Sequence, residues 1–201
     1  MDLPCNKRRP GSGCAALAGS DRGMAIFGWS EHCLATHPSD VAVALAALEA
    51  TVHTTQRAIP LDQFHRLPGD APERDHVLEQ GELITGISVP ASPLARRSRY
   101  LKVRERTSYE FALVSAAVGL ELDAAQRIRT ARLALGGVAH RPWRLPGAEQ
   151  ALVGASVQDA TDLRARISGA FADARPRRGN GFKVELAQRA VVRAIQLAGQ
   201  A

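Results

Sequence analysis

The second half of the chain restricts the fold more than any other feature, because its apolar pattern changes once, from strand-like to helical. Residues 99–104 alternate apolar and polar side chains, as a half-buried strand does. Residues 112–122 and 128–135 are mainly apolar and flank a turn, which is typical of buried strands. Helical segments follow at 148–152, 157–173 and 183–197. Strands followed by helices predict an α+β domain.

The first half of the chain contains one clear helix start. Residues 36–40 (Thr-His-Pro-Ser-Asp) combine hydroxyl caps, a proline near the first turn and an acid, which favour a helix N-terminus. Apolar residues at helical spacing then continue to about Ala50. We expect strands at 51–56 and 82–90, with a polar loop over 66–82 between them.

The composition excludes several classes of protein. The 201 residues include 26 Lys and Arg against 20 Asp and Glu, but the basic residues are scattered and aromatic residues make up only 4%. Nucleic-acid binding would require a recognisable motif or more stacking rings, so we expect no nucleic-acid partner. A basic face equally suits docking on an acidic partner subunit. No apolar run approaches the roughly 20 residues of a membrane span, so no membrane partner is expected either.

The three cysteines, Cys5, Cys14 and Cys33, are an odd number, which argues against a complete disulfide framework. One interpretation is three free thiols. The other is an iron–sulfur or zinc site, because Cys5 and Cys14 lie in a loop rich in proline and glycine whose basic residues 7–9 would lower the thiol pKa. The spacing contains no CxxC pair, and such clusters usually take four thiolates, so the pattern alone does not decide.

Residues 11–16 (Gly-Ser-Gly-Cys-Ala-Ala) match the G-x-G-x-x-A pattern of dinucleotide-binding loops. That motif must follow a buried strand and open a helix. The preceding residues 6–10 are polar and basic and end in proline, so we reject a dinucleotide-binding interpretation.

Several strings together resemble the FAD-binding medium subunit of bacterial molybdenum hydroxylases, in the periplasmic-type aldehyde oxidoreductase branch of the xanthine dehydrogenase family. The similarity extends in order over essentially the whole chain. The strings are residues 5–16, 25–28, 33–40, 81–87, 100–115, 135–144 and 182–187.

The resemblance implies an α+β fold made of two parts. Residues 1–91 would be the second half of a PCMH-type FAD-binding domain, with an iron–sulfur loop over residues 5–33. Residues 92–97 would be a linker, and residues 98–201 a C-terminal domain of the CO dehydrogenase flavoprotein type. The family's first FAD-binding subdomain, whose glycine-rich loops hold the pyrophosphate, is expected to be missing.

The resemblance also implies two cofactors, FAD and a [4Fe-4S] cluster. Cys5, Cys14 and Cys33 match three of the cluster ligands, and the remaining ligand would lie just upstream of Met1. The subunit would pass electrons from iron–sulfur clusters to the flavin and an external acceptor. Its partners would be a large molybdenum-cofactor subunit and a small [2Fe-2S] subunit, and no residue of this chain would be catalytic. The compartment stays open: cytoplasmic, or periplasmic if the chain is exported with a partner.

The flavin contacts are expected at the predicted helix start. Asp40 is a suitable acceptor for the single N–H donor on the pyrimidine edge of the ring, with Thr36 and Ser39 nearby. A helix N-terminus also stabilises an anionic reduced flavin. His37 is a possible flavin neighbour or an ordinary loop histidine. Without the resemblance, these residues would be interpreted simply as a helix cap.

Three further candidates lie on the predicted strands, and a fourth lies in the segment between two of them. Leu83 or Ile84 would pack against the flavin ring, the alternative being an ordinary strand residue. Lys102 resembles a flavin-contacting lysine of the family, and otherwise is a solvated strand lysine; Tyr109 is a weaker candidate.

Two functions therefore remain from the sequence. The first is an FAD-binding electron-transfer subunit, present here as a fragment. The alternative is a truncated, non-catalytic remnant that folds but binds no cofactor unaided.

Overall fold

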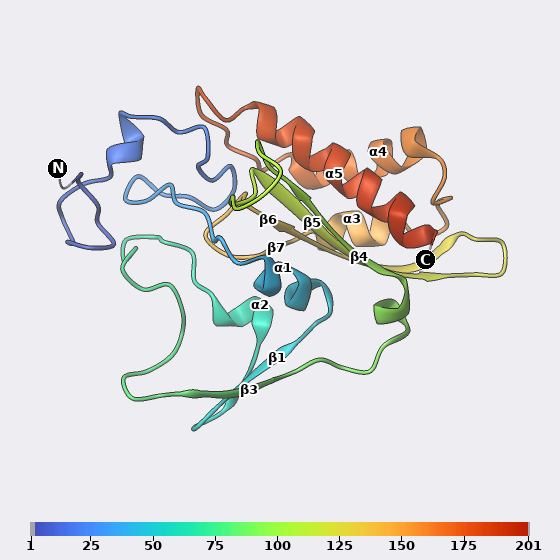
Figure 1. Ribbon diagram of the computed structural model, residues 1–201, viewed down its shortest axis with the longest axis horizontal. Coiled ribbons are helices and arrows are strands. Elements are labelled where there is room, and N and C mark those ends of the chain that lie inside the picture. The colour runs from blue at the N-terminus through green and yellow to red at the C-terminus, as the bar shows by residue number, and fades with distance from the viewer. Residues whose placement is uncertain (1–2, 201) are drawn as a thin grey trace.

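A computed structural model describes residues 3–200 of the chain (Figure 1). It confirms the α+β class: two separate antiparallel sheets are combined with helices. The smaller sheet has three strands, in the order β2 (Ala58–Pro60), β1 (Thr51–Thr54), β3 (Ile84–Ser88). The larger sheet has four, in the order β4 (Ser98–Val103), β5 (Val114–Leu122), β6 (Ile128–Gly136), β7 (Trp143–Arg144). Within the described residues, no helix has the length and apolar character needed to cross a membrane.

The larger sheet and its helices form the C-terminal part of the molecule. The helix α5 lies along one face of this sheet, with α3 and α4 beside it (Figure 1). Leu120, Leu133 and Ile195 are fully buried at this interface. The elements are β4 (Ser98–Val103), β5 (Val114–Leu122), β6 (Ile128–Gly136), β7 (Trp143–Arg144), α3 (Pro146–Ala151), α4 (Ala160–Ser168), the 3-10 helix η3 (Gly169–Phe171) and α5 (Phe182–Gly199).

The N-terminal part contains the smaller sheet and two short helices. Its helix α1 begins at Asp40, as predicted, because the Ser39 hydroxyl accepts a hydrogen bond from the Ala42 N–H at 3.1 Å. The strands are shorter than the predicted segments 51–56 and 82–90. The elements are the 3-10 helix η1 (Ala15–Leu17), α1 (Asp40–Ala47), β1 (Thr51–Thr54), β2 (Ala58–Pro60), α2 (Leu61–Phe64) and β3 (Ile84–Ser88).

The two parts share the strand β5, which is buried on both faces. Residues 114–120 are all buried because α5 covers one face and α1 the other. Ala117 accordingly belongs to a cluster with Val43 of α1, whereas Val118 belongs to the larger core beneath α5. Burial on both sides explains why six of the first seven residues of this strand are apolar or glycine, the exception being the buried Ser115.

The N-terminal loop also enters the C-terminal core. The backbone N–H groups of Ile26 and Phe27 donate to the Val138 carbonyl at 2.9 and 3.0 Å, and the Phe27 ring stacks on Trp143 with centroids 5.0 Å apart. The segment predicted as a linker forms the 3-10 helix η2 (Pro93–Arg97), whose Leu94 is buried against Gly119. A side chain at Gly119 would crowd Leu94, so the glycine permits this close packing.

Replacing Phe27 by alanine is expected to lower the free energy of unfolding by about 3–5 kcal/mol, because it leaves a cavity in a packed core. Phe111→Ala is the matched control: this ring is 74% exposed, and the expected change is within about 0.5 kcal/mol. Chemical denaturation of both variants measures the difference. Equal losses would contradict the packing of Phe27 in the core.

Candidate functional site

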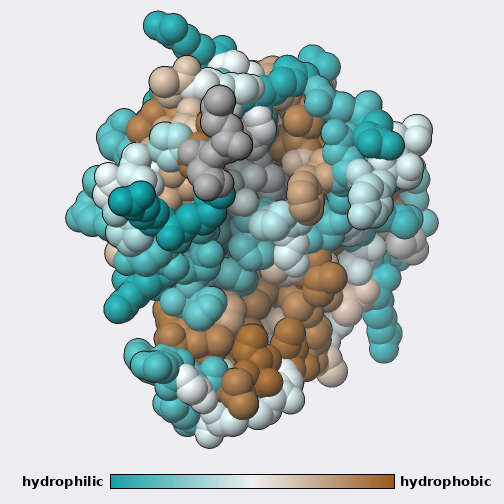
Figure 2. All heavy atoms as spheres, turned by 60° about the vertical axis from the view of Figure 1, so that its left-hand side comes forward, coloured by the Kyte–Doolittle hydropathy of each residue, from teal (hydrophilic) through white to brown (hydrophobic). Residues whose placement is uncertain are grey.

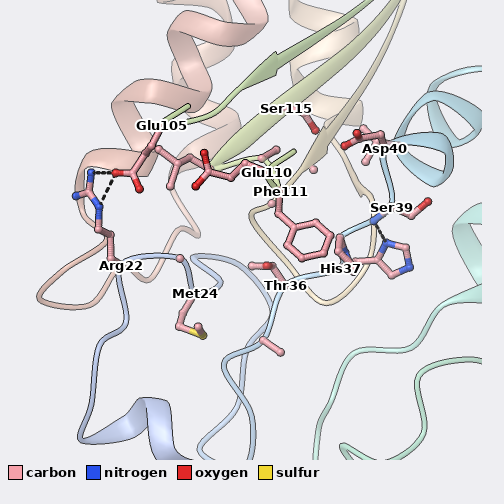
Figure 3. A pocket seen from close by; sticks show the side chains of 18 residues that line it. Arg22, Met24, Thr36, His37, Ser39, Asp40, Glu105, Glu110, Phe111 and Ser115 are labelled. Carbon is pink, nitrogen blue, oxygen red and sulfur yellow. Dashed lines mark hydrogen bonds and ion pairs between the residues drawn. The ribbon is translucent and has the colours of Figure 1, made fainter. Parts of the chain in front are cut away.

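A cavity of about 550 Å³ lies where the N-terminal loop, the start of α1 and the ends of β5 and β6 meet (Figure 3). Thr36, His37, Ser39 and Asp40, which were all predicted as site residues, line it together. The other lining residues are Arg22, Gly23, Met24, Ala35, Pro38, Val43, Glu105, Glu110, Phe111, Ala112, Leu113, Ser115, Gly136 and Gly137.

Asp40 is the most strongly held acid of the cavity. Its Oδ1 accepts a hydrogen bond from the Tyr100 hydroxyl at 2.7 Å, and its Oδ2 forms an ion pair with the Lys102 Nζ at 2.8 Å. Partial burial acts to raise the pKa of Asp40, but the hydrogen bonds from Lys102 and Tyr100 outweigh it and lower that pKa. The carboxylate is thus ionised and fixed in orientation at neutral pH.

The strand β4 explains this arrangement. Tyr100 and Lys102 are two residues apart, so both side chains leave the same face of the strand. The structure thereby joins Lys102 to Asp40, two residues that were predicted separately as flavin contacts. Tyr100 was missed, although its place on the same alternating face as Lys102 was the available signal. Burial and its bond to Asp40 raise the pKa of Tyr100, which therefore remains a hydrogen-bond donor.

Ser39 and His37 are held by local hydrogen bonds. Ser39 caps α1, and its own N–H donates to the His37 Nδ1 at 3.4 Å. Burial lowers the pKa of His37, so its ring is neutral at pH 7. The His37 ring also lies edge-on to His65, with centroids 4.4 Å apart.

Leu83 and Ile84 lie apart from this cavity and are not among its lining residues. Their side chains are 65% and 51% exposed, and Ile87 and Val89 of the same segment are also exposed. Figure 2 shows apolar side chains gathered on the lower part of the molecule, where Figure 1 places the three-stranded sheet. Tyr109 is also outside the cavity lining and is almost fully exposed, in a left-handed backbone conformation with φ 53°.

The loop after β4 supplies cavity residues that sequence reasoning missed. Glu105 and Glu110 bring two carboxylates, and Phe111 brings an exposed ring (Figure 3). Arg22 from the N-terminal loop donates to Glu105 Oε1 at 2.5 and 3.0 Å, which links two segments that line the cavity. These residues follow a strand with no distinctive spacing, so only the tertiary fold identifies them.

The three predicted cluster ligands are free thiols. The backbones of Cys5 and Cys14 pair in an isolated antiparallel β-bridge, and Cys33 is buried. Partial burial acts to raise the pKa of Cys5, but the N–H groups of Arg8 and Lys7 lower it overall. Burial raises the pKa of Cys33, and the charges of Cys14 and Cys5 add to this effect. The donor type suits an iron–sulfur cluster, yet residues 3–200 contain no group of three or more His, Cys, Asp or Glu side chains arranged to hold a metal ion.

Two histidines near this region, the buried His140 and the half-buried His65, were also missed. Both ring nitrogens of His140, which is only 4% exposed, lack a hydrogen-bond partner, as does the Nδ1 of His65. Burial lowers the pKa of each to about 4, so both rings are neutral at pH 7. Nothing in the sequence around them distinguishes them from surface histidines.

The cavity residues fit a flavin. Asp40 uses one lone pair on each oxygen and still exposes 40% of its side chain, so it can accept a further N–H from a ligand. Lys102 is not itself a lining residue, but its ammonium adds a positive charge through the ion pair with Asp40, and Phe111 and Val43 add apolar surface. An acceptor, a cation and apolar surface are what the polar edge and the flat faces of a flavin ring require.

Comparisons with known proteins identify the two parts of the chain. Residues 14–92 match the FAD binding domain in molybdopterin dehydrogenase, and residues 99–198 match the CO dehydrogenase flavoprotein C-terminal domain. The chain is 45% identical over 191 residues to the aldehyde oxidoreductase FAD-binding subunit PaoB of Escherichia coli, covering 92% of this chain and 56% of that protein. It is 28% identical over 150 residues to the glyceraldehyde dehydrogenase medium chain of Sulfolobus acidocaldarius, covering 72% of this chain and 50% of that protein. The chain thus spans about half the length of these relatives.

Solved structures show the same fold. Quinoline 2-oxidoreductase from Pseudomonas putida 86 matches with a TM-score of 0.66 and 24% identity, over 81% of this chain and 56% of that chain. The reconstituted CO dehydrogenase from Oligotropha carboxidovorans matches with a TM-score of 0.66 and 20% identity, over 79% of this chain and 56% of that chain.

Replacing Lys102 by methionine is expected to raise the pKa of Asp40, because it removes the ammonium that stabilises the carboxylate. A group whose pKa is lowered on folding contributes stability above its unfolded pKa, and this stability is lost as the pH falls through the folded pKa. The stability difference between wild type and Lys102→Met should therefore be largest at neutral pH and shrink below about pH 4. Carboxyl NMR titration measures the pKa directly, with Lys102→Arg as the charge-preserving control. An unchanged pKa in Lys102→Met would contradict the ion pair.

Proposed function

Because the chain belongs to the family of FAD-binding medium subunits of molybdenum hydroxylases, we propose that it binds FAD at the Asp40 cavity as part of an electron-transfer subunit. The observation that carries this proposal is Asp40, which is ionised, fixed by Tyr100 and Lys102, and still able to accept a hydrogen bond. When bound, FAD accepts electrons and passes them to an external acceptor.

Each residue at the cavity has a distinct role in this proposal. Asp40 accepts the ring N–H, and Lys102 holds Asp40 in place while contributing positive charge to the ring's polar edge. Thr36 and His37 contact the flavin ring or the chain of FAD attached to it, and Ser39 orients the first turn of α1. Leu83 or Ile84 covers a face of the ring. Since both side chains lie exposed on the smaller sheet, this contact requires the ligand to extend beyond the cavity.

We further propose that Cys5, Cys14 and Cys33 provide three thiolates of a [4Fe-4S] cluster. Support comes from the backbone β-bridge that pairs Cys5 with Cys14. The lowered pKa of Cys5 also supports it, since the thiolate is the form that binds iron. The chain offers no fourth cysteine, so the remaining ligand would come from outside it or from another residue type. The thiols must also move closer together to complete the ligand set.

A complex of several subunits completes the proposal. A large molybdenum-cofactor subunit would oxidise the substrate, and a small [2Fe-2S] subunit would pass the electrons to this chain. The net charge of +6 suits docking against an acidic face of such a partner. Aldehydes are the substrate class that the 45% identical relative indicates by its name.

Titration of the purified chain with FAD tests the cavity. Asp40→Ala is expected to weaken FAD binding about 10- to 100-fold, because a hydrogen bond to a charged acceptor contributes about 1.5–3 kcal/mol. Asp70→Asn is the matched control, since the Asp70 side chain is fully exposed and lies outside the cavity lining. Wild-type chain that binds no FAD would support the alternative of a non-catalytic remnant, whereas equal weakening in both variants would argue against Asp40 as the contact.

Anaerobic reconstitution with iron and sulfide tests the cluster. Wild type is expected to gain iron, sulfide and an electron paramagnetic resonance signal on reduction, and Cys5→Ser should lose most of each because a thiolate ligand is removed. Ser20→Ala is the control, since this exposed serine lies within residues 5–33 and contributes no thiol. Iron uptake that is identical in wild type and Cys5→Ser would exclude Cys5 as a ligand.

A further inference from the structure

Lys183 is a fully buried lysine at the start of α5 that no part of the proposed function uses. Its side chain is 0% exposed. The ammonium donates hydrogen bonds to the backbone carbonyls of Gly23, Met24 and Gly137, at 3.0, 2.9 and 2.6 Å. All three of its donor positions are therefore used, and each bond goes to a neutral group.

The charge of Lys183 has no carboxylate to balance it. Among the described residues, no Asp or Glu forms an ion pair with it. It also lies in the first turn of an 18-residue helix, where the positive end of the helix dipole disfavours a cation. Burial lowers the pKa of Lys183 to about 8, although the three carbonyl oxygens stabilise the charged form. Taking a charge out of water is unfavourable, and the three hydrogen bonds to carbonyl oxygens offset part of that cost.

The three residues that Lys183 binds connect its charge to the Asp40 cavity. Gly23, Met24 and Gly137, the three residues it holds, all line the Asp40 cavity (Figure 3). The ammonium thus lies directly behind the cavity wall and joins the N-terminal loop to the end of β6. The ammonium is bonded to the backbone of residues that line the cavity, and in this buried setting its charge is screened less than in water.

We propose that Lys183 positions the cavity wall for the flavin and supplies a positive charge that favours the reduced flavin; this inference rests on the proposed function. Two electrons and one proton convert the neutral oxidised ring into an anionic reduced ring, which gains one negative charge. The electrons come from the iron–sulfur partner in the proposed complex and from dithionite in the test. A buried cation behind the wall stabilises the anionic product more than the neutral reactant, and so makes the midpoint potential more positive.

Asn180 provides a matched control on the same segment. This fully buried amide donates to the carbonyls of Met24 and Ala25, both at 3.2 Å, and carries no charge. Asn180→Ala therefore removes hydrogen bonds from the same stretch of wall without changing its charge. Lys183→Gln removes the charge and keeps an amide donor.

The test is a spectroelectrochemical titration of the full chain loaded with FAD, with folding checked by circular dichroism. Lys183→Gln is expected to shift the flavin midpoint potential to more negative values, whereas Asn180→Ala should leave the potential unchanged. Lys183→Met serves as a second neutral variant if the glutamine does not fold. Equal potentials in wild type and a folded neutral variant would overturn the role of Lys183 while leaving FAD binding intact.

Hydrogen exchange of the wild type gives a second readout that needs no variant. Bound FAD is expected to slow amide exchange in residues 23–25, because the wall that Lys183 holds would contact the ligand. Bound FAD with unchanged exchange there would overturn the positioning role. A wild-type chain that takes up no FAD would overturn the proposed function itself, together with the flavin role of Lys183.

Discussion

The burial of β5 on both faces is the constraint on which the rest of the structure depends. Since α5 covers one face and α1 the other, the two parts of the chain share one strand and cannot pack independently. This places the first turn of α1 beside the ends of β5 and β6, where the cavity forms. Phe27 strengthens the same junction by stacking on Trp143. The site is thus a product of how the two parts pack, and neither part contains it alone.

At that junction, fixed charged groups and apolar side chains make the cavity suitable for a ligand with both polar and apolar surfaces. Tyr100 and Lys102 hold the Asp40 carboxylate from one strand, and this carboxylate keeps free acceptor capacity. The Lys183 ammonium lies behind the wall that residues 23, 24 and 137 form. Besides Asp40, Lys102 and Lys183, the charged side chains of Arg22, Glu105 and Glu110 lie at the same cavity. Clustered charges that are partly removed from water are costly and are typical of functional sites.

Local sequence patterns predicted the helices and strands, whereas the residue pairs that form the site depend on tertiary contacts. The start of α1 at Asp40 was predictable, because a capping serine and an early acid act within one turn. The order of strands before helices likewise gave the α+β class. The Asp40–Lys102 pair joins residues 62 positions apart, and Lys183 contacts the loop 159 and 160 positions upstream, so no local pattern could reveal them.

A crystal structure of the chain grown with FAD tests the central claim most directly. We expect electron density for the flavin ring in the cavity, with its N–H within hydrogen-bonding distance of Asp40 and one edge near Lys102. Leu83 or Ile84 should cover part of the ligand. A ring bound elsewhere on the molecule, or a cavity left without flavin in crystals of protein saturated with FAD, would contradict the account.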